Sequence, residues 1–380
     1  MKTEQSVYRV QHGWTDLNKF ESGEEAQIVL LFGSRELLKD VELFGDVKRR
    51  YPKAEIVGCS TAGEIINEEI LDNSIICTAI YFKTTRVRVI CEPIGRMADS
   101  FIIGSKLAER MEQEDLKHIM IFSEGLHING SELTKGIFSG LDTKVAVTGG
   151  LAGDQAKFEE TVIVFNAPGL SNLVMAIGFY GPDIRIGYGS MGGWDSFGVD
   201  RLVTRSKANI LYELDGQPAL ELYKKYLGGH ASGLPASALL FPLSVKLRDS
   251  DTSLVRTVLS VNDADGSMTF AGDIPEGEYV RLMKAGFERL IEGAALAAEM
   301  SEISLMEKDP DLVVLISCVG RKLLLKQRIE DEIESVRDVL GKKAAMTGFY
   351  SYGEICPAKP FEQQCEFHNQ TMTITSFKEV

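Results

Sequence analysis

The chain has 380 residues, with 41 Lys and Arg against 55 Asp and Glu, so its formal net charge is −14. Hydrophobic residues make up 44% and charged residues 25%, the balance of a globular protein that can form real cores. This length predicts two or three domains. The acidic charge argues against nucleic acid and anionic lipid surfaces as main partners, because both are bound by clustered Lys and Arg.

The termini and the cysteines predict the compartment. No segment approaches the roughly 18 consecutive apolar residues that a membrane span needs. The first residues, Met1 to Ser6, lack the apolar run of a secretory signal. The cysteines form no CxxC pair and are expected to be reduced thiols: Cys59, Cys77, Cys91, Cys318, Cys356 and Cys365. We therefore expect a cytoplasmic protein that does not insert into a membrane.

One pattern of residues occurs three times along the chain. Each copy has an apolar strand, a helical stripe of apolar residues and a second strand that runs into a glycine followed by an acidic residue. The copies start with the strands 28–32, 119–122 and 312–316, and they end at Gly63-Glu64, Gly153-Asp154 and Gly353-Glu354. A strand, a helix and a strand within about 30 residues have the size of one βαβ unit.

Further apolar and alternating segments follow each copy and predict antiparallel strands that widen the sheets: 74–82, 86–90, 162–165, 174–179, 184–186 and 371–376. The prediction is an α/β (α+β) fold with mixed sheets, built from repeated β-α-β units with antiparallel additions. A hairpin with an Asp265-Gly266 turn and a buried helix over 287–300 are also expected. The poorly periodic stretch after Trp194 divides the chain into two domains, 1–207 and 208–380.

A literal GxGxxG match, Gly187 to Gly192, follows a strand, but no helical stripe comes after it. A dinucleotide site needs a helix whose N-terminus faces the pyrophosphate, so we expect a loop here rather than a nucleotide site.

The repeat predicts where a ligand would bind. The carboxyl ends of its parallel strands meet at one sheet edge, where turns and helix N-termini expose N–H groups. The candidate ligand-binding residues at this edge are Ser60, Glu64, Asp154, Cys318, Arg321, Tyr350, Tyr352 and Glu354. Arg321 would hold a carboxylate, Glu64 or Glu354 an amine, and the tyrosines would wall the pocket. The alternative interpretation is that Glu64, Asp154 and Glu354 only cap neighbouring turns.

Two other chemistries are open. Cys59 and Cys318 follow strand ends and would serve a cysteine-dependent enzyme if a histidine lay nearby, although buried thiols are the more common case. The histidines are His12, His118, His127, His230 and His368, and they form no zinc-like cluster. A single histidine in an apolar pocket is enough for an axial haem ligand, so haem stays open as a cofactor.

Several segments resemble the FIST proteins, which pair a FIST N with a FIST C domain. These segments occur in the family's order: 57–64, 148–154, 212–219, 317–321, 348–355 and 368–371. The resemblance implies FIST N over 1–207, FIST C over 208–380, and a sensory protein rather than an enzyme. It implies small ligands, amino acids among them, and partners such as histidine kinases, cyclic-dinucleotide enzymes or chemoreceptors.

The same resemblance leaves a haem-binding nitric oxide sensor as an alternative, because a subset of the family looks like one. Only residues 372–380 follow the last matching segment, so no attached output module is expected. The leading hypothesis is a stand-alone cytoplasmic sensor that binds a small ligand and signals through a separate two-component or cyclic-dinucleotide protein.

Overall fold

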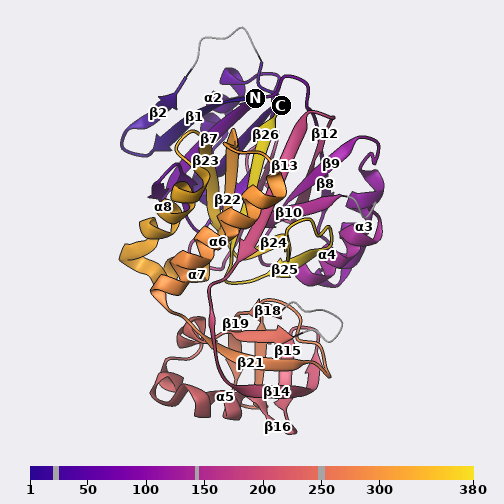
Figure 1. Cartoon of the computed structure of the whole chain (residues 1–380), viewed down its shortest axis with the longest axis vertical. Coiled ribbons are helices and arrows are strands. Elements are labelled where there is room, and N and C mark those ends of the chain that lie inside the picture. Colours follow the sequence, from indigo (N-terminus) through magenta and orange to yellow (C-terminus); the bar gives the residue numbers. More distant parts are fainter. Residues whose placement is uncertain (20–24, 142–144, 247–252) are drawn as a thin grey trace.

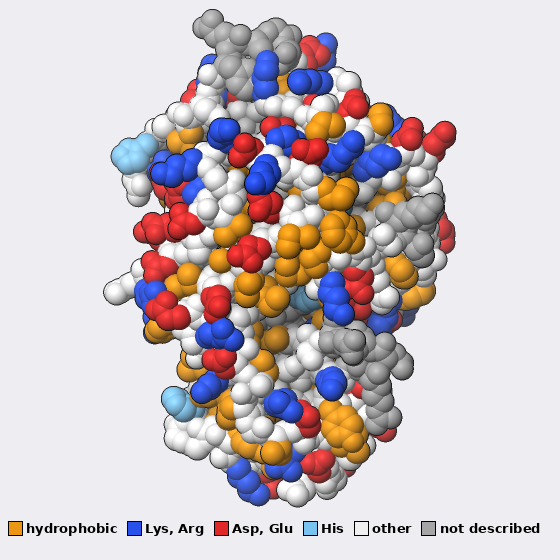
Figure 2. Space-filling view, in the orientation of Figure 1, with side chains coloured by type: hydrophobic (Ala, Val, Ile, Leu, Met, Phe, Trp, Pro, Cys, Tyr) orange, Lys and Arg blue, Asp and Glu red, His pale blue; other side chains and the backbone are white. Residues whose placement is uncertain are grey.

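The computed structural model describes residues 1–19, 25–141, 145–246 and 253–380 (Figure 1). They form a large body, built from both ends of the chain, and a smaller unit over residues 195–284 below it in the view. Along the described residues, no helix is both long and apolar enough to cross a bilayer. On the face shown in Figure 2, Lys and Arg side chains are mixed with Asp and Glu rather than gathered into one basic patch.

The three predicted repeats are confirmed as three βαβ units, each with a parallel strand pair. Unit one has β3 (Ile28–Gly33), α1 (Arg35–Leu38), α2 (Val41–Arg50) and β4 (Glu55–Ser60); unit two has β9 (Leu116–Ser123), α4 (Gly130–Ser139) and β10 (Ala146–Leu151); unit three has β22 (Leu312–Cys318), α7 (Val319–Leu325), the 3₁₀ turn η4 (Lys326–Arg328), α8 (Ile329–Leu340) and β23 (Ala345–Ser351).

Antiparallel strands extend each pair into a mixed six-stranded sheet, as the sequence predicts. The third strands are β7 (Ser74–Tyr81), β12 (Leu173–Tyr180) and β26 (Met372–Glu379), and beside them lie β1 (Lys2–Arg9), β8 (Arg86–Pro93) and β13 (Ile184–Met191). Sheet 1, sheet 2 and sheet 3 are named here after the unit that each contains. β2 (Gly13–Asn18) pairs with β1 at the edge of sheet 1.

The units exchange strands in a closed cycle. The chain leaving β4 enters sheet 3 as β5 (Glu64–Ile66), which is antiparallel to β23 and continues to β6 (Glu69–Leu71). The chain leaving β10 enters sheet 1 as β11 (Ile163–Phe165), antiparallel to β4. The chain leaving β23 enters sheet 2 as β24 (Gly353–Pro357), antiparallel to β10, and continues to β25 (Cys365–His368). Each sheet therefore contains a strand that belongs to a neighbouring unit.

The inner faces of the three sheets share one apolar core. Phe32 from sheet 1, Phe122 from sheet 2 and Phe349 from sheet 3 meet there, with ring centroids 4.8–5.8 Å apart. The outer faces pack on helices, so the central strands are buried on both sides and read as continuous apolar runs in the sequence.

The GxGxxG segment is a correction. Residues 187–191 are not a loop but the second half of strand β13, and only Gly192 lies beyond it. The strand packs against α6 (Phe287–Leu305), the helix expected over 287–300. A Cβ atom at Gly187 would collide with the carbonyl oxygen of Ser301, and one at Gly189 with that of Ala297. These glycines therefore let a strand and a helix approach closely, a tertiary contact that the local sequence does not reveal.

The smaller unit has its own sheet and its own core. The expected hairpin is present as β19 and β20. The predicted boundary at 207/208 falls in the turn between β14 and β15, within this unit. The unit comprises β14 (Asp195–Lys207), β15 (Ile210–Leu214), β16 (Gln217–Pro218), α5 (Ala219–Leu227), η2 (Gly228–Gly233), η3 (Ala236–Leu240), β17 (Leu243–Lys246), β18 (Ser253–Arg256), β19 (Val258–Asn262), β20 (Ser267–Phe270) and β21 (Tyr279–Lys284).

Candidate functional site

The three glycine-acid turns meet at one end of the body. The Gly153 N–H donates to the Ser60 carbonyl at 2.9 Å, and the Ala62 N–H donates to the Tyr350 carbonyl at 2.8 Å. The Tyr352 N–H donates to the Leu151 carbonyl at 3.2 Å. Each turn is thus bonded to both others, which is a direct result of the strand exchange that starts at each turn.

Glu64 and Glu354 occupy equivalent places and have equivalent partners. Glu64 accepts a hydrogen bond from the Thr61 hydroxyl at 2.6 Å and from the Ser74 hydroxyl at 2.7 Å. Glu354 accepts from the Ser351 hydroxyl at 2.5 Å and from the Thr371 hydroxyl at 2.9 Å.

Both carboxyl groups are buried inside their own turns. Burial raises the pKa of each to about 7, against the opposing effect of the hydroxyl donors. This arrangement joins each turn to the start of the following antiparallel strand.

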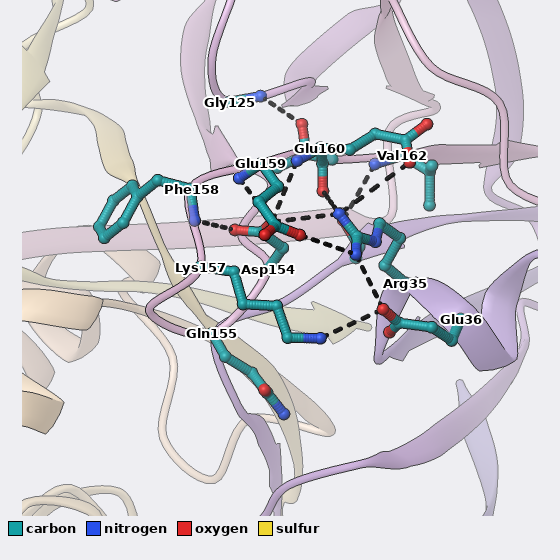
Figure 3. Close-up of polar contacts among 12 residues, drawn as sticks. Arg35, Glu36, Gly125, Asp154, Gln155, Lys157, Phe158, Glu159, Glu160 and Val162 are labelled. Carbon is teal, nitrogen blue, oxygen red and sulfur yellow. Dashed lines mark hydrogen bonds and ion pairs between the residues drawn. The ribbon is translucent and has the colours of Figure 1, made fainter.

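Asp154 caps a loop instead. Its carboxylate accepts the backbone N–H groups of Phe158, Glu159 and Glu160 at 2.9–3.0 Å (Figure 3). Arg35 lies 3.4 Å from the same carboxylate and also pairs with Glu36 and Glu159. The capping alternative that the sequence left open thus describes the contacts of Asp154, with an ion-pair network outside it.

Tyr352 connects this loop to an open surface. Its hydroxyl donates to the Asp154 carboxylate, and the carbonyl oxygen of Gln155 lies 3.2 Å from the same hydroxyl. Its ring stacks on Phe158, with centroids 4.4 Å apart and an angle of 17° between the planes. Asp154 therefore holds both rings of this pair in place. It accepts a hydrogen bond from the hydroxyl of Tyr352 and another from the backbone N–H of Phe158.

A pocket of about 130 Å³ opens beside this pair, between the body and the smaller unit. We call it the interdomain pocket, and its lining side chains are all uncharged. The body contributes Met97, Gly125, Leu126, Ile128, Asn129, Leu151, Phe158 and Tyr352, and the smaller unit contributes Asn209, Leu259 and Ala271.

The loop after β9 forms one wall of the interdomain pocket. Glu124 is buried, and its carboxylate accepts hydrogen bonds from the backbone N–H groups of Leu126 and His127. These bonds fix the conformation of the loop. The only sequence signal for the wall is the Ser123-Glu124-Gly125 strand end. Nothing local indicates that Asn209, Leu259 and Ala271 lie opposite, because their position depends on how the smaller unit docks.

Arg321 lies in the interior and not in the interdomain pocket. Its guanidinium group donates to Glu332 at 2.5 Å and to the Leu290 carbonyl at 2.7 Å, and it also donates to the Gly192 carbonyl. Both side chains of this ion pair are fully buried. Tyr350 donates its hydroxyl to the same Glu332 at 3.0 Å, so it belongs to this buried network.

The remaining predicted residues are also enclosed. The Ser60 hydroxyl accepts the backbone N–H of Val162 at 3.0 Å, which joins unit one to the strand that it receives. Cys318 and Cys59 are buried, and burial raises the pKa of both thiols above its ordinary value. Neither thiol is set up as the thiolate that cysteine-dependent catalysis requires.

The histidines divide into buried and exposed groups. His118 bonds to the Thr148 hydroxyl and stacks on Tyr188, and His368 bonds to the Cys356 carbonyl. Burial lowers their pKa values to about 3 and about 4. His12, His127 and His230 lie at the surface. No observation favours one of the five as a haem ligand.

Comparison with known proteins identifies relatives of this chain. An uncharacterized protein of Methanocaldococcus jannaschii is 21% identical over 376 aligned residues, which span 87% of this chain and 70% of that protein. A crystal structure of cyanuric acid hydrolase from A. caulinodans aligns with a TM-score of 0.37 and 6% identity, over 93% of this chain and 90% of that one. That similarity is too low to support any inference.

Family models give the decisive match. The FIST N domain matches residues 27–217 and the FIST C domain matches residues 219–357. Together they cover most of the chain, including the turns described above. The chain belongs to the FIST family, whose domains are associated with sensory signal transduction.

Proposed function

We propose that this protein is a sensor that binds a small molecule in the interdomain pocket and signals through a separate protein. The observation that carries the proposal is the lining, which comes from both units and includes the stacked Tyr352 and Phe158 rings. A ligand there would contact both units at once, so its binding would favour one arrangement of the two over others.

Size and charge restrict the ligand. An apolar cavity of about 150 Å³ holds one benzene molecule. A pocket of about 130 Å³ therefore favours a ligand about as compact as the smallest amino acids. The lining includes the side chain amides of Asn129 and Asn209, which already donate to Asp273 at 3.1 Å and to the Phe270 carbonyl at 2.7 Å. Each NH₂ group keeps one N–H for a ligand. A neutral polar molecule would fit it better than a zwitterion, whose charges would lack partners.

The site residues are assigned accordingly. Tyr352 contacts the ligand, and Asp154 holds Tyr352 in place. The partners of Glu64, Glu354 and Arg321 lie within the protein, so the proposal gives these three a structural part. The free cysteines support a reducing compartment, and we place the protein in the cytoplasm. The signalling partner would be a two-component or cyclic-dinucleotide protein, tested by co-purification with and without the ligand.

A thermal-shift screen with amino acids and neutral amides tests the binding site. Alanine and lactamide form a matched pair, one zwitterionic and one neutral. A ligand at 100 times its Kd adds about 2.7 kcal/mol of stability. Leu259→Trp adds bulk to the interdomain pocket, and Leu170→Trp is its control because both leucines are 49% exposed. We expect the shift to disappear only in Leu259→Trp. A screen without any stabilising compound, or a shift that survives Leu259→Trp, would refute the proposal.

A further inference from the structure

The outer faces of the three sheets are not covered alike. In unit two, α3 (Ser100–Arg110) packs beside α4 and on β8. In unit three, α6 packs beside α8 and on β13 and β26. Within the described residues of unit one, α1 and α2 have no such companion, and the hairpin of β1 and β2 lies beside α2 instead (Figure 1). The place of a second helix over β1 and β7 is thus open.

A pocket of about 210 Å³ occupies that place. We call it the hairpin pocket. Ser6 on β1 and Cys77 on β7 form its floor, Trp14 on β2 forms one side, and α2 forms the other. The complete lining is Ser6, Trp14, Asp46, Val47, Arg50, Tyr51 and Cys77.

Two hydrogen-bond donors in this lining have no acceptor. The indole Nε1 of Trp14 and the Nη2 of Arg50 are buried from solvent, and neither forms a hydrogen bond within the described part of the chain. Buried donors in proteins are almost always paired, and leaving them unpaired costs free energy. Both donors belong to side chains that line the hairpin pocket, so small rotations of these side chains would bring the donors to an acceptor bound there.

The surrounding charges determine what kind of acceptor fits. Arg50 already pairs with Asp16, and its Nη2 lies 3.9 Å from the buried carboxylate of Glu4. Asp46 is part of the lining. Asp46 pairs with Arg49, so two carboxylates, Asp16 and Glu4, stand at the Arg50 guanidinium group, and an anionic ligand would add a third negative charge there. A neutral carbonyl oxygen would accept both hydrogen bonds without that repulsion.

We propose that the hairpin pocket is a second binding site, which takes a small uncharged molecule with a carbonyl group and an apolar body. The carbonyl oxygen accepts from Trp14 and Arg50, and the apolar part lies against Val47 and the ring of Tyr51. This inference does not depend on the interdomain pocket, since the two pockets share no lining residue.

The indole N–H signals in an NMR spectrum of the ¹⁵N-labelled full chain test this proposal. The chain has two tryptophans, and Trp14→Phe assigns their signals. The indole of Trp194 already donates to the Gln370 carbonyl at 2.9 Å, so its signal is an internal control. Isobutyramide and isobutyrate are the probes, because they share a shape and differ in charge.

We expect isobutyramide to move the Trp14 signal in a saturable way and to leave the Trp194 signal in place. Its affinity should exceed that of isobutyrate at least tenfold, and Arg50→Met should weaken it. If isobutyramide causes no saturable movement up to its solubility limit, the hairpin pocket is not a ligand site. Equal or tighter binding of isobutyrate would overturn the assignment of an uncharged ligand.

Discussion

The buried ion pair between Arg321 and Glu332 gives the sharpest test of the site assignment. Arg321→Met keeps most of the side chain volume and removes the charge. Glu332 then loses its cation, and the carbonyls of Leu290 and Gly192 lose a donor. Breaking a fully buried pair from one side costs about 3–5 kcal/mol. We therefore expect the free energy of unfolding to fall by about that amount.

Urea unfolding of four variants measures this cost. Arg328→Met is the control, because Arg328 pairs with Glu288 and Asp331 and all three side chains are exposed, by 40%, 79% and 42%. Its loss should stay below about 1 kcal/mol. Glu332→Met and the double variant complete a mutant cycle, in which a coupling of about 2–3 kcal/mol is expected between Arg321 and Glu332.

The two roles considered for Arg321 predict different results. A ligand-binding arginine would be lost with little effect on unfolding, while ligand stabilisation in the thermal-shift screen disappeared. A structural arginine gives the opposite result. If Arg321→Met costs no more than Arg328→Met, or shows no coupling to Glu332→Met, the reasoning from the buried network is refuted.

Three further predictions follow from burial and packing. The pKa of His118 is about 3 in the folded state and near 6.5 in the unfolded state, so protonation below pH 6.5 favours unfolding. Between pH 7.5 and 5, urea titrations should show the wild type losing about 2 kcal/mol more stability than His118→Gln. Equal losses would contradict the effect of burial on this pKa. In mass-spectrometric labelling with iodoacetamide, the partly exposed Cys91 should react before Cys59 and Cys318, and early labelling of Cys318 would revive the catalytic alternative. Gly187→Ala should lower the free energy of unfolding by about 1–3 kcal/mol or more, whereas Gly229→Ala, with open space around it, should change it by less than about 0.5 kcal/mol; similar values would speak against the close contact of β13 with α6.

The predictable part of the fold is the part that depends on neighbours in sequence. Each βαβ unit has an apolar strand and a helical stripe within about 30 residues, and both patterns come from burial on a sheet. The exchange of strands was not predictable, because a three-residue strand such as Glu64–Ile66 carries no signal of which sheet it will enter. Its partner residues on β23 lie about 280 positions further along the chain.

The same difference between local and distant contacts explains how much of the candidate site could be predicted. Arg321 follows a strand end, which is where a ligand-binding arginine is expected, but its partners are Glu332 on α8 and two backbone carbonyls from distant segments. Every residue has a backbone carbonyl group, so a sequence pattern cannot show which of them will accept a hydrogen bond from Arg321. Tyr352 and Asp154 lie in the turns themselves, so the repeat pattern places both at this sheet edge. The opposite wall of the interdomain pocket required knowledge of how the smaller unit docks.

The strand exchange connects the interdomain pocket to the three sheets of the body. Tyr352 lies where the chain crosses from β23 to β24, and Phe158 lies where it crosses from β10 to β11. The two stacked rings therefore stand on two of the three crossings that join the sheets. A ligand that prefers one position of these rings would shift the equilibrium between sheet arrangements by the difference in its affinity for them, and by no more. The proposed signalling from this site would require a partner that distinguishes those arrangements, most directly by contacting a sheet edge that a crossing strand completes.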